Sequence, residues 1–322
     1  MQAIVMPNRG YIPRFTVYTF IALCLIIAPP FMGTALVSLL NKILIFMLLA
    51  MSLDLVFGYA GLWHFGHAGI FGVGAYTTGI LIKHFGITSF WLAAPAGIFV
   101  AVLAAAIFGF IALRMTTFYF FLITFALGQL IFGLAMQWVD MTGGIDGLPG
   151  IPYPDLGFSL SFSPISYYYF TLVIVAVSAV LLYVITKSPF GYSLQGIRES
   201  EIRMRCLGYN TWLYKQIALI ISGVFAGLAG VLYIYFNGLV TPENTNFATS
   251  GLLVFMVIIG GAGTLWGAAI GSALIVSLQY FIGLATPEHW PLIVGIIFVA
   301  AVKFLRGGIF PHLLKLWMKG EQ

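Results

Sequence analysis

The chain has 322 residues but only 14 Lys and Arg and 9 Asp and Glu, so that 7% of its residues are charged. Soluble domains carry about 25% charged residues. Hydrophobic residues make up 61%, and the mean hydropathy is +1.06. This composition excludes a water-soluble globule, and it excludes a disordered chain, which needs low hydrophobicity and high charge. Lipid is therefore the expected solvent for most of the chain.

Long apolar runs separate the few charged residues, and a membrane-spanning helix needs about 20 apolar residues. We therefore expect an all-α polytopic membrane protein, with residues 1–322 forming one transmembrane domain of about ten segments. The expected segments are 15–32, 36–57, 64–82, 90–113, 117–138, 166–186, 216–236, 249–262, 265–284 and 290–305. Segments 64–82 and 249–262 are rich in glycine, so each is expected either to span fully or to form a re-entrant or broken helix.

The distribution of charge predicts the sidedness of the chain. Residues 187–215 contain five bases, whereas residues 139–165 contain three acids and no base. Because Lys and Arg concentrate on the cytoplasmic side, 187–215 is expected to be a cytoplasmic loop and 139–165 a periplasmic loop. Both termini are then cytoplasmic, which agrees with ten segments. The net charge of +5 lies at the ends of apolar runs rather than on a soluble basic stripe, which argues against a nucleic-acid binder.

The loop 187–215 has a helical pattern at its centre. Between Ser193 and Leu207, apolar residues recur at helical spacing with charged residues between them, and Gly208 follows where a C-cap glycine belongs. Such an amphipathic helix is either a solvated linker or a docking element for a cytoplasmic partner. The chain has no GxxxxGK[ST] motif, so a separate subunit would have to bind ATP if ATP drives this protein.

Two glycine clusters fall in opposite halves of the chain. Glycine in a membrane helix permits close helix packing, and it also permits broken helices beside a translocation path. Both interpretations remain open for these residues. The candidate conformational glycines are Gly61, Gly66, Gly72, Gly74, Gly260, Gly261 and Gly263.

A few polar residues stand inside the apolar segments, where polar side chains usually face protein or water. Those that are candidates for lining a translocation path are His64, His67, Thr124, Gln129 and Gln279. A metal site is not expected, because zinc requires three or four ligands and only two histidines lie together. Asp54 is expected either to pair with a helix N-terminus or water, or to take part in gating.

Four blocks of sequence resemble branched-chain amino acid ABC transporter permeases of the LivM type. Together they span residues 36 to about 305, in the family's order. The first is Gly58-Tyr59-Ala60-Gly61 with Gly66-His67-Ala68 and Phe71-Gly72-Val73-Gly74-Ala75-Tyr76. The second is Thr142-Gly143-Gly144-Ile145-Asp146-Gly147-Leu148 with Gly150-Ile151-Pro152. The third is Ser188-Pro189-Phe190-Gly191 with Ile197-Arg198-Glu199, and the fourth is Gly260-Gly261-Ala262-Gly263-Thr264-Leu265-Trp266-Gly267.

The resemblance implies a permease subunit of an ATP-driven importer in the bacterial inner membrane that carries branched-chain or related amino acids. The implied partners are a second related permease, two ATPase subunits that bind ATP and Mg, and a periplasmic binding protein. No cofactor is expected in this chain. By resemblance, the amphipathic stretch is a coupling helix that contacts an ATPase subunit. The residues expected to do so are Arg198, Glu199, Glu201, Arg203, Leu207 and Gly208.

Two departures from the family pattern leave alternatives open. Trp63-His64-Phe65 stands where the family usually has Leu-Ser-Leu, and Ala268 stands where the family often has proline. An importer of the same type that carries urea, short amides or aromatic acids is therefore an alternative. A stand-alone secondary transporter or channel would need an intramembrane ion site, for which Asp54 is the candidate carboxylate. A membrane enzyme would need a cluster of catalytic residues, which the sequence lacks.

Overall fold

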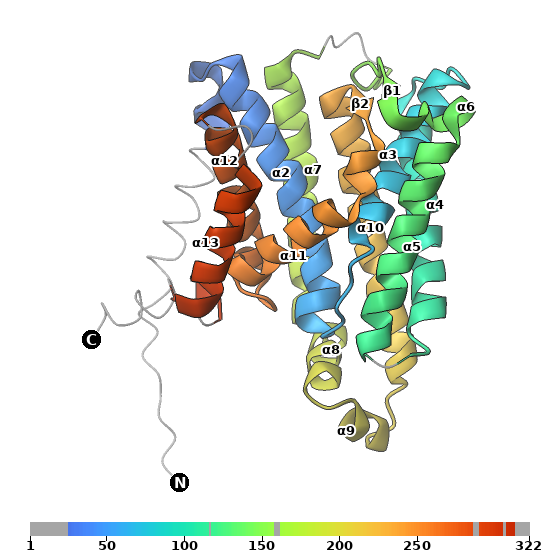
Figure 1. Ribbon diagram of the computed structural model, residues 1–322, viewed down its shortest axis with the longest axis vertical. Helices are drawn as coiled ribbons and strands as arrows, with labels where there is room; N and C mark the ends of the chain where they lie inside the picture. Colours follow the sequence, from blue (N-terminus) through green and yellow to red (C-terminus); the bar gives the residue numbers. More distant parts are fainter. Residues whose placement is uncertain (1–24, 116, 158–161, 286–289, 305–306, 313–322) are drawn as a thin grey trace.

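The computed structural model describes residues 25–115, 117–157, 162–285, 290–304 and 307–312, and these form a bundle of long helices (Figure 1). Helices α8 and α9 project from one end of the bundle, and strands β1 and β2 lie at the other end. In chain order the elements are η1 (Pro29–Phe31), α2 (Thr34–Asp54), η2 (Leu55–Tyr59), α3 (His67–Lys83), α4 (Phe90–Ala112), α5 (Thr117–Gln137), α6 (Val139–Thr142), η3 (Gly144–Asp146), β1 (Leu148–Pro149), α7 (Pro164–Lys187), α8 (Pro189–Glu199), α9 (Glu201–Cys206), α10 (Thr211–Asn237), β2 (Leu239–Val240), η4 (Pro242–Thr245), α11 (Phe247–Gly260), α12 (Leu265–Ala285) and α13 (Trp290–Phe304).

Six helical stretches among the described residues are long and apolar enough to cross a membrane. They are Thr34–Tyr59, Phe90–Ala112, Phe118–Gln137, Pro164–Lys187, Thr211–Asn237 and Leu265–Ala285. Each corresponds to one expected segment. The expectation of ten is not confirmed, because α3, α11 and α13 are shorter helices, and most of the expected segment 15–32 lies outside the described residues.

Both glycine-rich segments form short helices that border a non-helical stretch of chain. Helix α2 ends in the π-helix η2, and residues 60–66 then continue without helical structure into α3, which has 17 residues. Helix α11 has 14 residues, which at 1.5 Å per residue is about 21 Å, against about 30 Å for the hydrocarbon core. It runs across the bundle rather than along it (Figure 1). Neither segment is among the six stretches long and apolar enough to cross a membrane, so two full spans are not confirmed for these segments.

Helix α10 occupies the centre of the bundle and packs against α2, α3 and α4. Glycine makes the α3–α10 contact possible. A Cβ on Gly74 would lie 2.7 Å from the carbonyl oxygen of Gly227, and a Cβ on Gly230 would lie 2.1 Å from that of Phe71. Real side chains do not tolerate such distances, so the two backbones approach more closely than any other residue would permit.

The expected periplasmic loop is a compact cap at the end of the bundle opposite α8 and α9 (Figure 1). Its short strand β1 pairs antiparallel with β2, with Leu148 opposite Val240 and Pro149 opposite Leu239. Asp146 lies in the 3-10 helix η3, and glycines with positive φ flank it at Gly143, Gly144 and Gly147. Asp146 is therefore part of a tight turn.

We predict that Gly74→Ala destabilises the protein by about 1–3 kcal/mol, because the added methyl forces α3 and α10 apart. The measurement is thermal unfolding of the purified protein in detergent. Gly133→Ala is the matched control, since Gly133 also lies in a helix but has no atom within 4 Å of an added Cβ. It should leave stability unchanged or raise it by up to about 1 kcal/mol through helix propensity. Equal melting temperatures for Gly74→Ala and the unmodified protein would refute close packing as the role of Gly74.

Candidate functional site

The projecting loop contains two helices where the sequence pattern predicts one. Ser200 is extended, at φ −161° and ψ 102°, and separates α8 from α9. The break has a local cause, because the Ser200 hydroxyl accepts a hydrogen bond from the backbone N–H of Arg203, 3.4 Å away, as an N-cap. The prediction of one continuous helix from Ser193 to Leu207 is therefore wrong.

This break divides the apolar residues of the loop into two sets. Leu194 and Ile197 on α8 are 0% and 3% exposed and pack into the bundle. Ile202 and Leu207, on α9 and at its C-terminal end, are 76% and 71% exposed. A single amphipathic helix would have buried all four on one face. The second set instead forms an exposed apolar tip, which we define as Ile202 and Leu207.

Gly208 terminates α9 in the conformation that the sequence predicts. Its φ is +87°, in the left-handed region that favours glycine. Its N–H donates to the carbonyl of Arg205 at 3.0 Å, and the N–H of Tyr209 donates to that of Met204 at 3.1 Å. These two bonds form a Schellman motif, which satisfies the last carbonyls of the helix and turns the chain toward α10.

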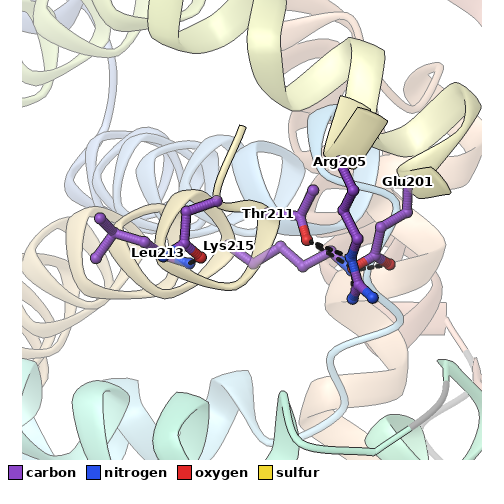
Figure 2. Close-up of polar contacts among 6 residues, drawn as sticks. Glu201, Arg205, Thr211, Leu213 and Lys215 are labelled. Carbon is purple, nitrogen blue, oxygen red and sulfur yellow. Dashed lines mark hydrogen bonds and ion pairs between the residues drawn. The ribbon is translucent and has the colours of Figure 1, made fainter. Parts of the chain in front are cut away.

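Glu201 fastens α9 to the start of α10 (Figure 2). Its Oε1 accepts from Arg205 Nη2 at 2.7 Å and from Thr211 Oγ1 at 2.9 Å, and its Oε2 accepts from Lys215 Nζ at 2.6 Å. We call these four residues the Glu201 clamp. Partial burial alone would raise the pKa of the Glu201 carboxyl, but the hydrogen bonds from Lys215, Thr211 and Arg205 and the charge of Lys215 outweigh it and lower the pKa to about 2.

Arg198 connects α8 to the transmembrane core. Its Nη1 donates to the carbonyl oxygen of Gly58, which belongs to the π-helix η2 at the end of α2. Gly61 lies against the same side chain with φ +72°, and a Cβ there would be 2.8 Å from Arg198 Cγ. The resemblance implies that Arg198 contacts an ATPase subunit. In the structure, its guanidinium forms a hydrogen bond with the bundle.

Asp54 lies at the same place and accepts a backbone hydrogen bond. Its Oδ1 is 2.7 Å from the N of Gly263, two residues before α12 begins. Gly263 belongs to the turn that precedes the N-cap of α12, so this bond is to a turn N–H beside that helix. A Cβ on Gly58 would lie 2.0 Å from Asp54 Oδ1 and 2.2 Å from Gly263 N, so only glycine fits between them. Asp54, Gly58, Arg198 and Gly263 thus join α8, η2 and the α11–α12 turn, and we call them the junction.

The remaining expected coupling residues are on the surface. Glu199 and Arg203 are exposed, and neither side chain makes a hydrogen bond or an ion pair with another described residue. They add exposed charges to the loop that contains the apolar tip. This outer side has both charged and apolar groups available for a partner.

Three of the five path candidates lie together where α3 begins. His64 and His67 are buried with ring centroids 5.5 Å apart, and His67 Nε2 is 2.8 Å from Ser52 Oγ. Thr124 accepts a hydrogen bond from the backbone N–H of Phe65 at 3.3 Å. Both ring nitrogens of His64 lack a hydrogen-bond partner among the described residues.

The two glutamine candidates lie elsewhere. Gln129 is half-buried on α5, and its amide makes no hydrogen bond to another described residue. Gln279 on α12 lines a cavity together with Lys42, which sequence reasoning did not single out. The signal available for Lys42 was its place as the one base inside the expected segment 36–57, which also contains Asp54. Among the described residues, no group of three or more His, Cys, Asp or Glu could hold a metal ion.

The candidate glycines divide into two kinds. Gly61, Gly261 and Gly263 have positive φ, so they serve backbone turns beside the junction. The others serve close packing, since a Cβ on each would lie within 2.7 Å of another group. These are Gly66, Gly72, Gly74 and Gly260.

Comparison with known proteins places this arrangement in a family. The family model described as branched-chain amino acid transport system / permease component matches residues 35–302. The high-affinity branched-chain amino acid transport system permease protein LivM of Escherichia coli K12 is 30% identical over 280 residues, 79% of this chain and 65% of LivM. The corresponding LivH of Salmonella typhimurium is 26% identical over 71% of this chain and 78% of LivH.

This chain thus spans 65% of the length of the E. coli LivM that it matches. Among solved structures, PsaBC from Streptococcus pneumoniae in complex with Fab is similar with a TM-score of 0.46 and 13% identity, over 88% of this chain and 95% of that chain. The family match covers most of the chain, including the interrupted helices, the junction and the loop of α8 and α9. The chain belongs to the family of branched-chain amino acid transport system permease components.

Proposed function

We propose that this chain is the permease subunit of an ATP-driven importer in the bacterial inner membrane, and that its cargo is a branched-chain or related amino acid. A second related permease completes the membrane path, and a periplasmic binding protein delivers the cargo. Two ATPase subunits bind ATP and Mg²⁺ and dock on the loop of α8 and α9, so this chain performs no catalysis. Family membership supports this proposal.

The observation that carries the proposal is the exposed apolar tip. A loop that meets water normally hides its large apolar side chains, but Ile202 and Leu207 are more than 70% exposed on a helix fixed at both ends. An exposed apolar patch with a polar rim is typical of a protein interaction site. Here Glu199 and Arg203 provide the rim. An ATPase groove that covers the tip would bury these side chains.

Motion of a docked ATPase has two routes into the membrane. The Glu201 clamp connects α9 to α10, the central helix of the bundle. The junction connects α8 to the end of α2 and the start of α12 through Arg198 and Asp54. Because both connections use charged hydrogen bonds, which are stronger than neutral ones, the loop and the bundle move as one body.

The cargo is the least constrained part of the proposal. His64, which departs from the family pattern, is fully buried against Phe108 and Phe120. Its single ring, with both nitrogens unpartnered among the described residues, changes the surroundings of the start of α3. An amino acid cargo therefore remains the proposal, with urea, short amides and aromatic acids as the alternatives to be measured.

We predict ATP-dependent uptake of leucine, isoleucine or valine by the reconstituted complex with its binding protein. Replacing the phosphate-binding lysine of the ATPase subunits should abolish uptake, because hydrolysis drives the cycle. Radiolabelled uptake into proteoliposomes measures this, and binding of candidate solutes to the periplasmic protein identifies the cargo. Uptake that persists with the inactive ATPase would refute the importer, and uptake of urea or amides alone would refute the amino acid cargo.

We predict that Ile202→Asp and Leu207→Asp each weaken ATPase docking about 30-fold, since a central apolar contact contributes about 2 kcal/mol to binding. Co-purification of the ATPase subunits with the permease measures the effect. The permease itself should keep its melting temperature, because both side chains are exposed. Ile145→Asp is the matched control, since Ile145 is 73% exposed at the opposite end of the bundle. Unchanged co-purification for both loop variants would contradict docking at the tip.

We predict that Glu201→Gln speeds hydrogen exchange of the α9 amides about fivefold, which corresponds to about 1 kcal/mol for a pair partly exposed to water. Less cargo should then be transported per ATP hydrolysed. Because the folded-state pKa is lowered from 4.5 to about 2, the stabilisation by the clamp is fully present above pH 4.5 and is lost as the pH falls toward 2.

Exchange corrected for its intrinsic pH dependence should accordingly be constant above pH 4.5 in the unmodified protein. Glu199→Gln is the control, since that carboxylate is exposed and makes no ion pair with a described residue. If both variants exchanged at the same rate as the unmodified protein, the clamp would not fasten α9.

A further inference from the structure

A cavity of about 530 Å³ lies between the halves of α2, α10 and α12 that are distant from the projecting loop. Lys42 is eight residues into α2, so it lies about 12 Å from the helix start at the end opposite the junction. Ser38 of α2 and Gln279 and Tyr280 of α12 are further polar lining residues. A volume of this size is in the range of small-molecule sites.

Four polar side chains of this cavity, Ser38, Lys42, Gln279 and Tyr280, have no hydrogen bond or ion pair with another described residue. Among the described residues, no carboxylate lies within 4 Å of Lys42 Nζ, which instead lies 5.9 Å from the ring centroid of Phe46. Ser38, Gln279 and Tyr280 make no side-chain hydrogen bond to another described residue. Polar groups at membrane depth need partners, and an intramembrane charge usually marks a functional site. A solute bound in the cavity would supply partners for these groups.

The remaining walls fit an amphipathic solute. Leu39, Phe236 and Val276 provide an apolar surface beside the charged group. At the rim, Asn237 donates its side-chain N–H to the carbonyl of Leu239 at 2.9 Å, which leaves its amide oxygen as an acceptor. Lys42 thus matches a carboxylate, and the amide oxygen of Asn237 matches an ammonium group. The apolar wall matches an aliphatic side chain.

We propose that this cavity receives the transported amino acid, with Lys42 as the counter-ion of its carboxylate and Gln279 as a second polar contact. This inference rests on the proposed function and assigns a cargo site within this chain. The cavity lies in the half of the bundle opposite the ATPase loop, the half at which the binding protein would deliver cargo. An anionic lipid headgroup offers the same anionic oxygen atoms, so the experiment must separate the two sources.

The test uses the complete importer in vesicles of phosphatidylcholine alone and of phosphatidylcholine with phosphatidylglycerol. Uptake of labelled leucine is measured for the unmodified complex, Lys42→Met and Lys42→Arg. Because a charged hydrogen bond is lost, Lys42→Met should lower uptake about tenfold or more in both vesicles, whereas Lys42→Arg keeps most of it. Lys83→Met is the matched control, since Lys83 is exposed at the same end and outside the cavity, and it should leave uptake unchanged.

Each other outcome is decisive. Unimpaired uptake by Lys42→Met, or an equal loss in Lys42→Arg, overturns this inference but leaves the proposed function intact. A loss seen only in vesicles with phosphatidylglycerol assigns the cavity to lipid and also overturns it. If Lys42→Met fails to assemble, Gln279→Leu is measured in its place. We expect this variant to need a higher leucine concentration for half-maximal uptake. An unchanged concentration would overturn the inference. An unmodified complex that takes up no amino acid overturns the proposed function itself.

Discussion

Backbone groups inside a membrane need hydrogen-bond partners, and this chain interrupts its helices at two places where the usual partners are missing. After η2 the chain runs through residues 60–66 before α3 begins, and between α11 and α12 it turns at Gly261 and Gly263. A free N–H or C=O in hydrocarbon is costly, so side chains from other helices must reach these points. Several polar side chains of the bundle form hydrogen bonds with these backbone groups.

Four contacts meet this requirement. Thr124 accepts from Phe65 N, and Ser250 accepts from Ala68 N at 3.2 Å. Asp54 accepts from Gly263 N, and Arg198 donates to the carbonyl of Gly58. Each side chain comes from an element remote in sequence, so these bonds fix helix positions while they satisfy the interrupted backbone. The helix interruptions therefore need these side chains as hydrogen-bond partners, and the same bonds hold the helices in position.

The sequence predicts the helical class and the places of the long helices well, because apolar length is a local property. All six long spanning stretches begin and end within a few residues of their expected bounds. Gly208 was predictable for the same reason, since a Schellman ending depends on adjacent residues. The break at Ser200 was not predicted, because periodicity alone does not show that a serine in an amphipathic run caps a new helix.

The roles of the polar residues were harder to predict, because they depend on distant partners. Thr124 was a path candidate, and in the structure it bonds to a backbone 59 residues away. Arg198 was expected at a partner surface, and its contact with Gly58 depends on the packing of α8 on η2. Lys42 is evident in the sequence as the one base of its segment, but its proposed role depends on the cavity that three helices form around it.

Two helices connect the loop end of the bundle to that cavity. Helix α2 carries Asp54 and leads into Gly58 at the junction, and its other half carries Ser38 and Lys42. Helix α12 begins two residues after Gly263, and its far half carries Gln279. A displacement of α8 that moves Arg198 would therefore act on both helices at one end and change the separation of the cavity walls at the other. Gly58 and Gly263 hold the backbones at the junction in close contact, so the proposed docking of a partner would reach the cavity along α2 and α12.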